Sequence, residues 1–418
     1  MSTEPVHRPS PAARALPRPH DGVWPGLAEV PVAPLRARVA ESLFRRAVRT
    51  LPVTVVMPDG ETLGTGGPRM DIRRPDAFFA RLGTSSKIGF GEAYMVGDWT
   101  SPTPADLLTP FAARLAQLVP PALQRLGRRW VEARRPDDEV NTLEGARRNI
   151  HRHYDLSNDL FALFLDETMS YSAAWFPPGG DDLAAAQRRK IDGILDMAGV
   201  TEGMHVLEIG TGWGGLAVRA ARRGARVTTL TISAEQASLA ERRIAEAGVA
   251  DRVQVLLRDY REARGSYDAV VSVEMIEAVG ERFWPTYFAT LDRLLRPGGR
   301  VGLQSITMPH DRLMVSRGDH TWIHKYVFPG GLIPSVEAIE ANLAAHSSLR
   351  IARRRSLGQD YARTLAHWNA RFQERRACVA ALGFDETFRR MWEFYLAYCE
   401  AGFRVGYLDV FQFSLHRR

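Results

Sequence analysis

A glycine-rich turn is the part of this sequence most clearly suited to chemistry. Residues 206–215 read VLEIGTGWGG, an apolar run that ends in a cluster of glycines. The glycines fit G-x-G-x-x-G through Gly210, Gly212 and Gly215, and also a shorter G-x-G-x-G that ends at Gly214. Glycines let the backbone turn sharply and approach a ligand closely. The pattern alone leaves open whether the ligand is a nicotinamide cofactor.

Three neighbouring features favour S-adenosylmethionine (SAM) over a dinucleotide. Glu208 precedes the turn, where a carboxylate can accept hydrogen bonds from the amino-acid end of SAM or order the loop, but would repel a pyrophosphate. The second strand ends in LTIS, without the acid that a dinucleotide fold needs for the ribose, and Gln236 is the nearest polar group able to serve. The block LLRPGGRVGL (Leu294–Leu303) resembles the class I SAM-dependent methyltransferases. The sequence therefore predicts SAM as the cofactor.

Alternating strands and helices must position this turn. From about Asn158, the apolar runs MHVLEIG, ARVTTLTIS, RVQVLLRDY, YDAVVSVE and RVGLQSITM alternate with amphipathic helical stretches. This alternation predicts an α/β fold with a Rossmann-like, doubly wound and mostly parallel sheet. From about Ser335 we expect mostly amphipathic helix, which would form a lid.

The chain divides into four predicted parts. Residues 1–30, rich in Pro, Arg and Ala, are expected to be a disordered arm, and residues 31–127 a small α+β domain. Residues 128–157 are charged throughout and are expected to form a helical connector, and residues 158–418 the SAM-dependent methyltransferase domain. Within the small domain, RPDAFFARLG predicts a helix and GFGEAYMVGDWTS a loop.

Composition narrows the class of protein. A chain of 418 residues with 45% hydrophobic and 25% charged residues is typical of globular proteins, and only two cysteines suit a reducing cytoplasm. No apolar run is long enough for a transmembrane helix, and the N-terminus does not resemble a secretory signal. The net charge of +7 is compatible with nucleic acid, an anionic membrane or neither. His151 and His153 lack further ligands nearby, so we expect no metal site.

Four longer stretches resemble one enzyme family. They are HYDLSNDLFALFLDETMSYSAAWF (His153–Phe176), EMIEAVG (Glu274–Gly280), KYVFPGGLIPS (Lys325–Ser335) and YCEAGFRVGYLDVFQFSL (Tyr398–Leu415). They resemble the cyclopropane-fatty-acyl-phospholipid synthases and their relatives, the mycolic acid cyclopropane synthases, over roughly Arg36 to the C-terminus. The mycolic acid enzymes generally lack the extra N-terminal domain, so the chain looks like the phospholipid-acting branch.

The resemblance implies roles for individual residues. Bicarbonate, bound at the reaction centre, would be the base. Glu277 and Tyr361 match two side chains around that ion, Cys399 matches a cysteine near it, and Gln304 stands where a histidine usually reaches it. The residues implied to bind SAM are Tyr171, Ser172, Val206, Leu207, Glu208, Ile209, Gly210, Thr211, Gly212, Trp213, Gly214, Thr231, Ile232, Ser233, Gln236, Tyr260 and Arg261, with Asp259 in the same turn.

The chemistry of the implied reaction explains these residue types. A cis alkene is a poor nucleophile, so the methyl group must be presented in line and in a dry pocket. Its transfer leaves a carbocation, which the ring faces of Tyr171, Trp175, Phe176 and Tyr361 could stabilise. The base then removes a proton, and its position decides between a cyclopropane ring and an alkene such as an exocyclic methylene.

The sequence departs from the family pattern near the base. Ala173 stands where a cysteine is common, and Gln304 replaces the histidine. Glutamine can hold an anion through its amide N–H groups but cannot carry a positive charge or relay a proton. The departures are either harmless, with a cyclopropane product, or they alter the base and give a 10-methylene chain, the precursor of a methyl branch. Both interpretations stay open.

We therefore expect a cytoplasmic SAM-dependent enzyme, bound peripherally to the inner face of the membrane, that modifies the double bond of unsaturated phospholipid acyl chains. Nucleic acid is not an expected partner, a homodimer is expected by resemblance, and a reductase would be a partner if the product is a methylene. Two other functions remain: a methyltransferase acting on a small molecule or on RNA, and a lipid-binding homologue that has lost catalysis.

Overall fold

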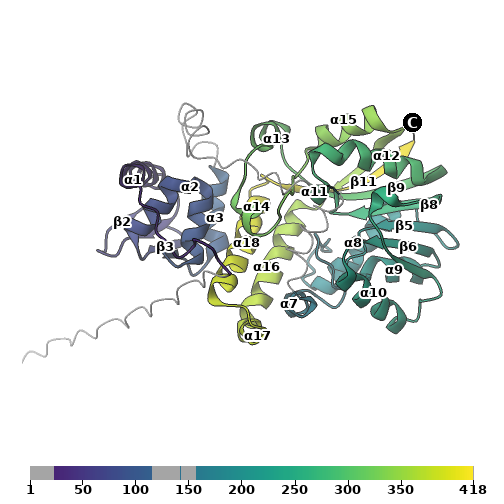
Figure 1. Ribbon diagram of the computed structural model, residues 1–418, viewed down its shortest axis with the longest axis horizontal. Helices are drawn as coiled ribbons and strands as arrows, with labels where there is room; N and C mark the ends of the chain where they lie inside the picture. Colours follow the sequence, from purple (N-terminus) through teal and green to yellow (C-terminus); the bar gives the residue numbers. More distant parts are fainter. Residues whose placement is uncertain (1–22, 115–141, 143–156, 418) are drawn as a thin grey trace, which may run out of the picture.

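The computed structural model describes residues 23–114, 142 and 157–417 of the protein (Figure 1). A smaller N-terminal unit and a larger unit built around a seven-stranded sheet lie at opposite ends of the molecule. The helices α16 (Gly358–Glu374) and α18 (Glu386–Arg404) lie between them. Most of the predicted arm and connector, with His151 and His153, falls outside the described residues.

The large sheet confirms the predicted doubly wound, mostly parallel architecture. Its strands are β5 (His205–Ile209), β6 (Arg226–Thr231), β7 (Val253–Leu257), β8 (Tyr267–Val273), β9 (Leu295–Thr307), β10 (Leu349–Ser356) and β11 (Asp409–Arg417). They run in the order β10-β11-β9-β8-β5-β6-β7. The five strands from β5 to β9 pair in parallel, and β11 is antiparallel to both of its neighbours. The chain order reverses on either side of β5, and ligands bind at such switch points in open α/β sheets.

Helices cover both faces of this sheet because its central strands are apolar on both sides. Val206 and Val271 share one buried cluster with helices α8 and α9, while Leu207 and Val270 share another with α12 and α15. The helices of the larger unit are α7 (Asn158–Phe164), α8 (Leu183–Met197), α9 (Gly215–Arg222), α10 (Ala234–Glu246), α11 (Ile276–Val279), α12 (Trp284–Leu294), α13 (His310–Ser316), α14 (Trp322–Tyr326), α15 (Val336–His346), α16, α17 (Arg376–Ala381) and α18. In the described part of the chain, no helix combines the length and apolarity needed to cross a membrane.

The C-terminal region is mostly helical, as predicted, but it also contains strands that the sequence did not indicate. Two of its segments, β10 and β11, are strands that complete the large sheet beside β9. The sheet gains them because β11 continues the hydrogen-bonding edge of β9, pairing Gln412 with Gln304. This pairing places the side chain of Gln412 against Gln304, one of the residues predicted to be catalytic.

The N-terminal unit combines a small sheet with three helices. The strands β1 (Thr54–Val56), β2 (Thr62–Leu63), β3 (Arg69–Ile72) and β4 (Trp99–Thr100) run in the order β2-β1-β3-β4. The helices are α1 (Pro34–Val48), α2 (Pro75–Met95) and α3 (Pro104–Ala113). Part of the predicted arm contacts this unit, since Leu27 is buried and its carbonyl accepts a hydrogen bond from Arg81.

The predicted loop GFGEAYMVGDWTS is wrong for its first half, which belongs to α2. That helix bends at Ser86, where φ is 47°, and then continues through Gly89 and Gly91. A Cβ atom on Gly89 would collide with the carbonyl oxygen of Arg81, and one on Gly91 would lie 2.5 Å from the Trp322 ring. The glycines therefore serve close helix packing and not a flexible loop.

The two units are joined by buried and half-buried polar contacts. Glu92 on α2 accepts hydrogen bonds from Lys325 (2.5 Å) and from the Tyr326 hydroxyl (2.8 Å) on α14. Arg390 on α18 donates to the carbonyl oxygens of Tyr94 (2.6 Å) and Trp99 (3.1 Å). These contacts hold α14 and α18 against the N-terminal unit, and both helices lead toward the site described next.

Candidate active site

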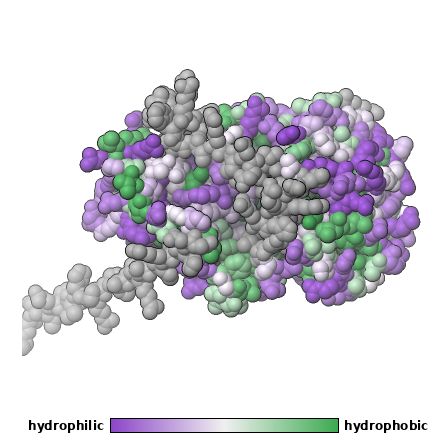
Figure 2. Space-filling model, in the orientation of Figure 1, coloured by the Kyte–Doolittle hydropathy of each residue, from purple (hydrophilic) through white to green (hydrophobic). Residues whose placement is uncertain are grey.

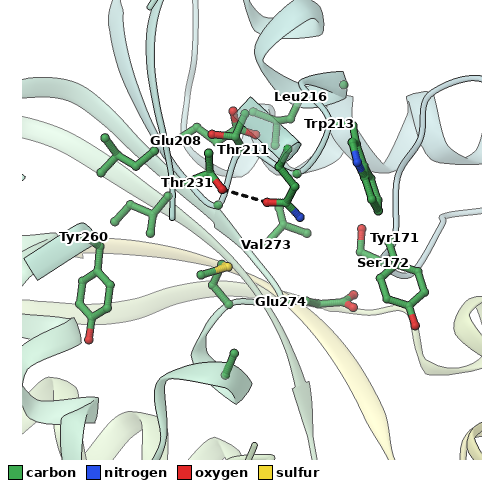
Figure 3. Close-up of a pocket in the computed structure, with 18 of the residues that line it drawn as sticks. Tyr171, Ser172, Glu208, Thr211, Trp213, Leu216, Thr231, Tyr260, Val273 and Glu274 are labelled. Carbon is green, nitrogen blue, oxygen red and sulfur yellow. Dashed lines mark hydrogen bonds between the residues drawn. The ribbon is translucent and has the colours of Figure 1, made fainter. Parts of the chain in front are cut away.

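A pocket opens at the carboxyl ends of β5, β6 and β8, where the strand order reverses (Figure 3). It collects most of the residues predicted to bind SAM: Tyr171, Ser172, Glu208, Ile209, Gly210, Thr211, Gly212, Trp213, Thr231, Ile232, Gln236, Tyr260 and Arg261. Four predicted residues do not line it. Val206 and Leu207 are buried inside β5, Gly214 caps α9, and the Ser233 hydroxyl accepts a hydrogen bond from the backbone N–H of Gln236.

The glycine turn has the backbone geometry that requires glycine. Gly210, Gly212 and Gly214 have φ values of 96°, 51° and 84°, in the left-handed region that residues with a Cβ rarely adopt. A Cβ on Gly210 would also lie 2.7 Å from the Met275 side chain. The turn then leads directly into α9, so backbone N–H groups at the start of this helix face the pocket.

Glu208 stands at the mouth of β5 and lines the pocket. Its Oε2 accepts a hydrogen bond from the Thr229 hydroxyl (2.6 Å), which also lies 2.7 Å from the Thr211 hydroxyl in the turn. Burial raises the pKa of Glu208 to about 8. The Glu208 side chain therefore orders the loop, which is one of the two roles predicted for it. A positively charged ligand group bound beside it would favour its ionised form.

The ends of β6 and β7 supply further polar groups to the pocket. The Thr231 hydroxyl donates to Oε1 of Gln236 (2.9 Å, dashed in Figure 3), which leaves the Gln236 amide nitrogen as a donor. Asp259 is bound by both the Nε and an Nη of Arg261 at 2.8 Å. These groups could hold the ribose and base of a nucleoside without a carboxylate at the end of β6.

Lys190 is a pocket residue that the sequence reasoning did not single out. It is buried on α8, lines the pocket, and donates to the Ser172 hydroxyl at 2.7 Å. Burial lowers the pKa of Lys190 to about 8, although the nearby charges of Glu274, Asp166 and Glu208 oppose the shift. A buried ammonium beside Ser172 is suited to a ligand carboxylate.

Glu274 is the second residue that the sequence reasoning missed, although it opens the quoted motif EMIEAVG. It follows β8, lines the pocket, and points toward Tyr171 and Ser172 (Figure 3). Its Oε1 accepts hydrogen bonds from the backbone N–H of Ala173 (2.9 Å) and from Nε2 of Gln304 (2.8 Å). Its φ of 52° is unusual for a residue other than glycine. Strained backbone of this kind is most common at functional sites.

The four residues predicted to be catalytic gather around Glu274. Gln304 donates to it, and the Tyr361 hydroxyl lies close enough to lower its pKa through a hydrogen bond. The charges of Glu274 and Glu277 and the thiol of Cys399 all raise the pKa of Tyr361, after burial itself. The structure therefore brings the four together, although none of them lines the SAM pocket directly.

Glu277 and Cys399 are both held in their neutral forms. Burial, and then the charge of Glu274, raise the pKa of Glu277 to about 8. Its Oε1 accepts from the Ile306 backbone (2.5 Å) and the Ser305 hydroxyl (3.0 Å), while its buried Oε2 has no partner among the described residues. Burial raises the pKa of Cys399 to about 12, so it is a thiol and not a nucleophilic thiolate at neutral pH.

Aromatic rings enclose the site, but not all of those predicted. The Tyr171 hydroxyl lies 2.8 Å from that of Tyr395, and the Tyr171 ring packs 5.1 Å from Trp368. The prediction is wrong for Trp175 and Phe176. Guanidinium groups of Arg189 and Arg355 face the Trp175 ring at 4.0 and 3.9 Å, and Arg363 faces the Phe176 ring at 4.0 Å. Both rings are thus engaged by arginines and are not free to face a cationic substrate.

A signal for the missed residues was present in the sequence. Glu274 ends an apolar strand, and the carboxyl ends of parallel strands form the ligand-binding edge of a doubly wound sheet. Lys190 is one of only three lysines in the chain and lies on the mostly apolar buried face of α8. An unpaired charge at such a position is seldom structural.

Comparison with known proteins agrees with this geometry. Residues 141–413 match the family model described as mycolic acid cyclopropane synthetase. The chain belongs to this family. Its members include cyclopropane synthases and methyltransferases, so the protein is a SAM-dependent enzyme that modifies fatty acids, as the sequence predicted.

Two curated relatives match along most of the chain. The tuberculostearic acid methyltransferase UfaA1 of Mycobacterium tuberculosis is 53% identical over 94% of this chain and 95% of its own. The cyclopropane-fatty-acyl-phospholipid synthase of Escherichia coli K12 is 34% identical over 85% of this chain and 89% of its own. The N-terminal unit is therefore shared with both the methyltransferase and the cyclopropane synthase, and it does not distinguish between them.

Solved structures of family members support the fold and the cofactor. The cyclopropane synthase MmaA2 of Mycobacterium tuberculosis is 35% identical, with a TM-score of 0.60 over 64% of this chain and 97% of its own. The mycolic acid cyclopropane synthase CmaA1, solved with S-adenosylhomocysteine (SAH), is 33% identical with the same TM-score and coverage. The larger unit is thus a class I SAM-dependent methyltransferase fold, and the pocket lies where such a fold binds its cofactor.

Proposed function

We propose that this enzyme transfers the methyl group of SAM to the double bond of an unsaturated phospholipid acyl chain and releases a 10-methylene chain. The observation that carries this proposal is the 53% identity to a tuberculostearic acid methyltransferase along nearly the whole of both chains. Tuberculostearic acid is a stearic acid with a methyl branch at carbon 10. A methylene at that carbon needs only reduction to become this branch, so we also infer a reductase that consumes the product.

The pocket residues divide the recognition of SAM between them. SAM supplies an electrophilic methyl group on a positively charged sulfur. Glu208 is placed to accept hydrogen bonds from an ammonium group, and Ser172 with Lys190 to bind a carboxylate, so together they suit the amino-acid end. Gln236 offers its amide nitrogen to the ribose. This assignment keeps the reactive end of the pocket beside Glu274 and Tyr171 (Figure 3).

The tyrosines around Glu274 suit a cationic acyl chain. Burial raises the pKa of Tyr361 and of Tyr395 well above the usual value, so both hydroxyls remain protonated. A phenolate would compete with the alkene for the methyl group, whereas a neutral ring offers only its negative face. The ring centroids of Tyr171 and Tyr361 lie 5.1 and 6.0 Å from that of Trp368, so the three rings can share this role.

The route to a methylene needs one more event than the route to a ring. After methyl transfer the cation lies on the neighbouring chain carbon. Loss of a methyl proton at that stage closes a cyclopropane, whereas a prior hydride shift moves the cation to the branched carbon, and loss of a methyl proton then gives the methylene. The family resemblance implies bicarbonate as the base beside Glu277 and Tyr361. The position and timing of that base decide the product.

The exposed face of α1 is our proposed contact with the membrane that holds the substrate. Leu35 and Val39 are 76% and 59% exposed on this face, and Arg38 and Arg46 are exposed beside them. Figure 2 shows hydrophobic surface gathered over α1 at the N-terminal end of the molecule. The single acidic residue of α1, Glu41, is paired with Arg45 on the same helix. An apolar stripe flanked by arginines is complementary to an anionic phospholipid bilayer.

The experiment is incubation of the full chain with SAM labelled in the methyl group and vesicles of dioleoyl phosphatidylglycerol. The proposal predicts label in the acyl chains, and NMR of the released fatty acid must show the vinyl protons of a methylene. A cyclopropane signal would instead identify the ring-forming function. Label found only in soluble acceptors would contradict lipid modification altogether.

A further inference from the structure

The two positions at which the sequence departs from the family pattern converge on one atom. Ala173 and Gln304 both donate hydrogen bonds to Oε1 of Glu274, at 2.9 and 2.8 Å. Gln304 is in turn fixed, because its Oε1 accepts from Nε2 of Gln412 (3.0 Å) on β11. The Glu274 carboxylate is therefore held in one orientation, and the Tyr361 hydroxyl lies close enough to it to lower its pKa through a hydrogen bond.

These residues do not fit a bound bicarbonate. An anion at this place would need the donors that the site provides, yet the Ala173 N–H and the Gln304 amide already donate to Glu274. Ala173 adds no polar side chain of its own. The remaining neighbour, Glu277, would present a buried oxygen without a hydrogen-bond partner among the described residues. An anion at this place would also be repelled by the Glu274 carboxylate.

We propose that the Glu274 carboxylate is the catalytic base of this enzyme and takes the place that bicarbonate has in its relatives. The inference rests on the proposed function, because it assumes an acyl carbocation that must lose a proton. Glu274 meets the geometric requirement, since it lines the SAM pocket beside Tyr171 and Ser172, near which the methyl group must be transferred (Figure 3).

The step is balanced without any further reactant. The S–CH₃ bond breaks and its electron pair stays on sulfur, while the alkene π electrons form the new C–C bond. A C–H bond of the transferred methyl then breaks, and its electron pair forms the methylene double bond after a hydride shift, or the ring without one. The proton goes to the Glu274 carboxylate, which becomes a carboxylic acid and returns the proton to water after product release.

Unlike a bicarbonate ion, the Glu274 carboxylate is attached to the protein backbone and cannot diffuse. A base tethered to the end of β8 cannot follow the cation along the chain, so it can act only when the methyl protons face it. A cation that is not deprotonated at once has time for the hydride shift. A fixed carboxylate therefore favours the methylene over the ring, in agreement with the proposed product.

Bicarbonate depletion gives the first test, with the full chain as the enzyme. In buffer freed of carbon dioxide, the wild type is expected to keep its rate of SAH formation and of acyl labelling. If the rate collapses and added bicarbonate restores it, the proposal is overturned. If the wild type labels no lipid with or without bicarbonate, the proposed function fails instead, so the two failures are distinguishable.

Substitution gives the second test. Glu274→Gln keeps the size of the side chain and is expected to lower kcat by at least about 100-fold, because general bases typically contribute that much. Its SAM affinity and melting temperature should remain close to those of the wild type. Glu274→Gly, which also suits the backbone φ of 52°, should regain activity when bicarbonate is added. A Glu274→Gln enzyme with unchanged kcat would refute the role, as would a Glu274→Gly enzyme that bicarbonate does not rescue.

A third variant keeps the test decisive if these two fold poorly. Glu274→Asp retains a carboxylate but withdraws it by one methylene. It should remain active and shift the ratio of methylene to cyclopropane among the products. An unchanged product ratio at full activity would show that Glu274 does not remove the proton.

Discussion

Gln304 and Glu274 are joined twice across the ends of β8 and β9. The backbone N–H of Glu274 donates to the carbonyl oxygen of Gln304 (2.8 Å), and Nε2 of Gln304 donates back to Oε1 of Glu274 (2.8 Å). The first bond fixes the unusual backbone of Glu274 and the second fixes its carboxylate. Gln304 is therefore a positioning residue for Glu274, and not a weaker copy of a histidine that would hold a free anion.

Gln304→Leu should weaken catalysis through the protonation state of Glu274. Burial raises the pKa of the Glu274 carboxyl, and the hydrogen bond from the Gln304 amide lowers it. Removing this amide therefore raises the pKa further. The acidic limb of the kcat–pH profile is expected to move to higher pH by about one unit, the equivalent of one hydrogen bond to a charged group. The KM for SAM should not change. Steady-state kinetics across pH measure both quantities.

Gln412→Leu is the matched control for that prediction. Gln412 donates to Gln304 but does not touch Glu274, so its loss removes a similar buried hydrogen bond one residue further away. We expect a modest loss of stability and a much smaller shift of the pH profile than in Gln304→Leu, because Gln304 keeps its own hydrogen bond to Glu274. If both variants shift the profile equally, Gln304 acts only through general packing.

Much of the fold could be predicted because each central strand is recognisable from its own stretch of sequence. The apolar runs of β5 to β9 are each long enough to indicate a buried parallel strand. β10 gives no such signal, since LRIARRRS places four arginines on a mostly exposed edge strand. The helix through Gly89 and Gly91 was predicted as a loop because the glycines are explained by contacts with Arg81 and Trp322 and not by their neighbours in sequence.

The candidate site, like the fold, could be predicted from the sequence only in part. The turn of residues 210–214 is contiguous, so its ligand class could be read from sequence and resemblance together. Glu274 could not be recognised as the centre of the reaction site, because Ala173, Gln304 and Tyr361 reach it from three other segments. A hydrogen-bond network among such distant residues is set by the strand order of the sheet.

The affinity for SAM should rise with pH up to about pH 8. Burial raises the pKa of Glu208 to about 8, so its carboxyl is mostly protonated near pH 6 and must ionise to accept hydrogen bonds from an ammonium. Binding therefore releases a proton, and the affinity should increase by up to about tenfold per pH unit below the pKa. Above about pH 8 the α-amino group of SAM loses its own proton and the affinity should fall. Calorimetry in buffers of different ionisation enthalpy measures the affinity and the proton release.

Glu208→Gln tests the origin of that pH dependence. The amide cannot ionise, so the rise between about pH 6 and pH 8 should flatten and the proton release should disappear. A wild-type affinity that does not vary with pH would exclude Glu208 as the partner of the ammonium.

Lys190→Met should weaken SAM binding selectively at the amino-acid end. The substitution removes the buried ammonium that supports Ser172, and a hydrogen bond to a charged group is worth about 10- to 100-fold in affinity. Methylthioadenosine lacks the amino-acid end, so the variant should bind it as the wild type does. Lys87→Met, at an exposed lysine on α2, is the control and should bind both ligands normally. An equal loss of affinity for both ligands would indicate a distorted pocket instead.

Membrane binding should depend on the face of α1. Replacing Leu35 and Val39 with Glu removes two apolar side chains and opposes the charge of Arg38 and Arg46. Each buried apolar side chain contributes about 1.5–3 kcal/mol, so partition onto anionic vesicles should fall by at least about tenfold. Vesicle co-sedimentation at low and high salt measures this, and the wild-type binding should weaken as salt increases.

The matched control for that face is the pair Val315→Glu and Leu382→Glu, which changes two exposed apolar residues on α13 and after α17 by the same charge. These substitutions should leave vesicle binding largely intact. Both double variants should also keep the wild-type affinity for SAM, because neither pair lines the pocket. Equal losses of vesicle binding in the two pairs would mean that net charge, and not the α1 face, governs attraction to the bilayer.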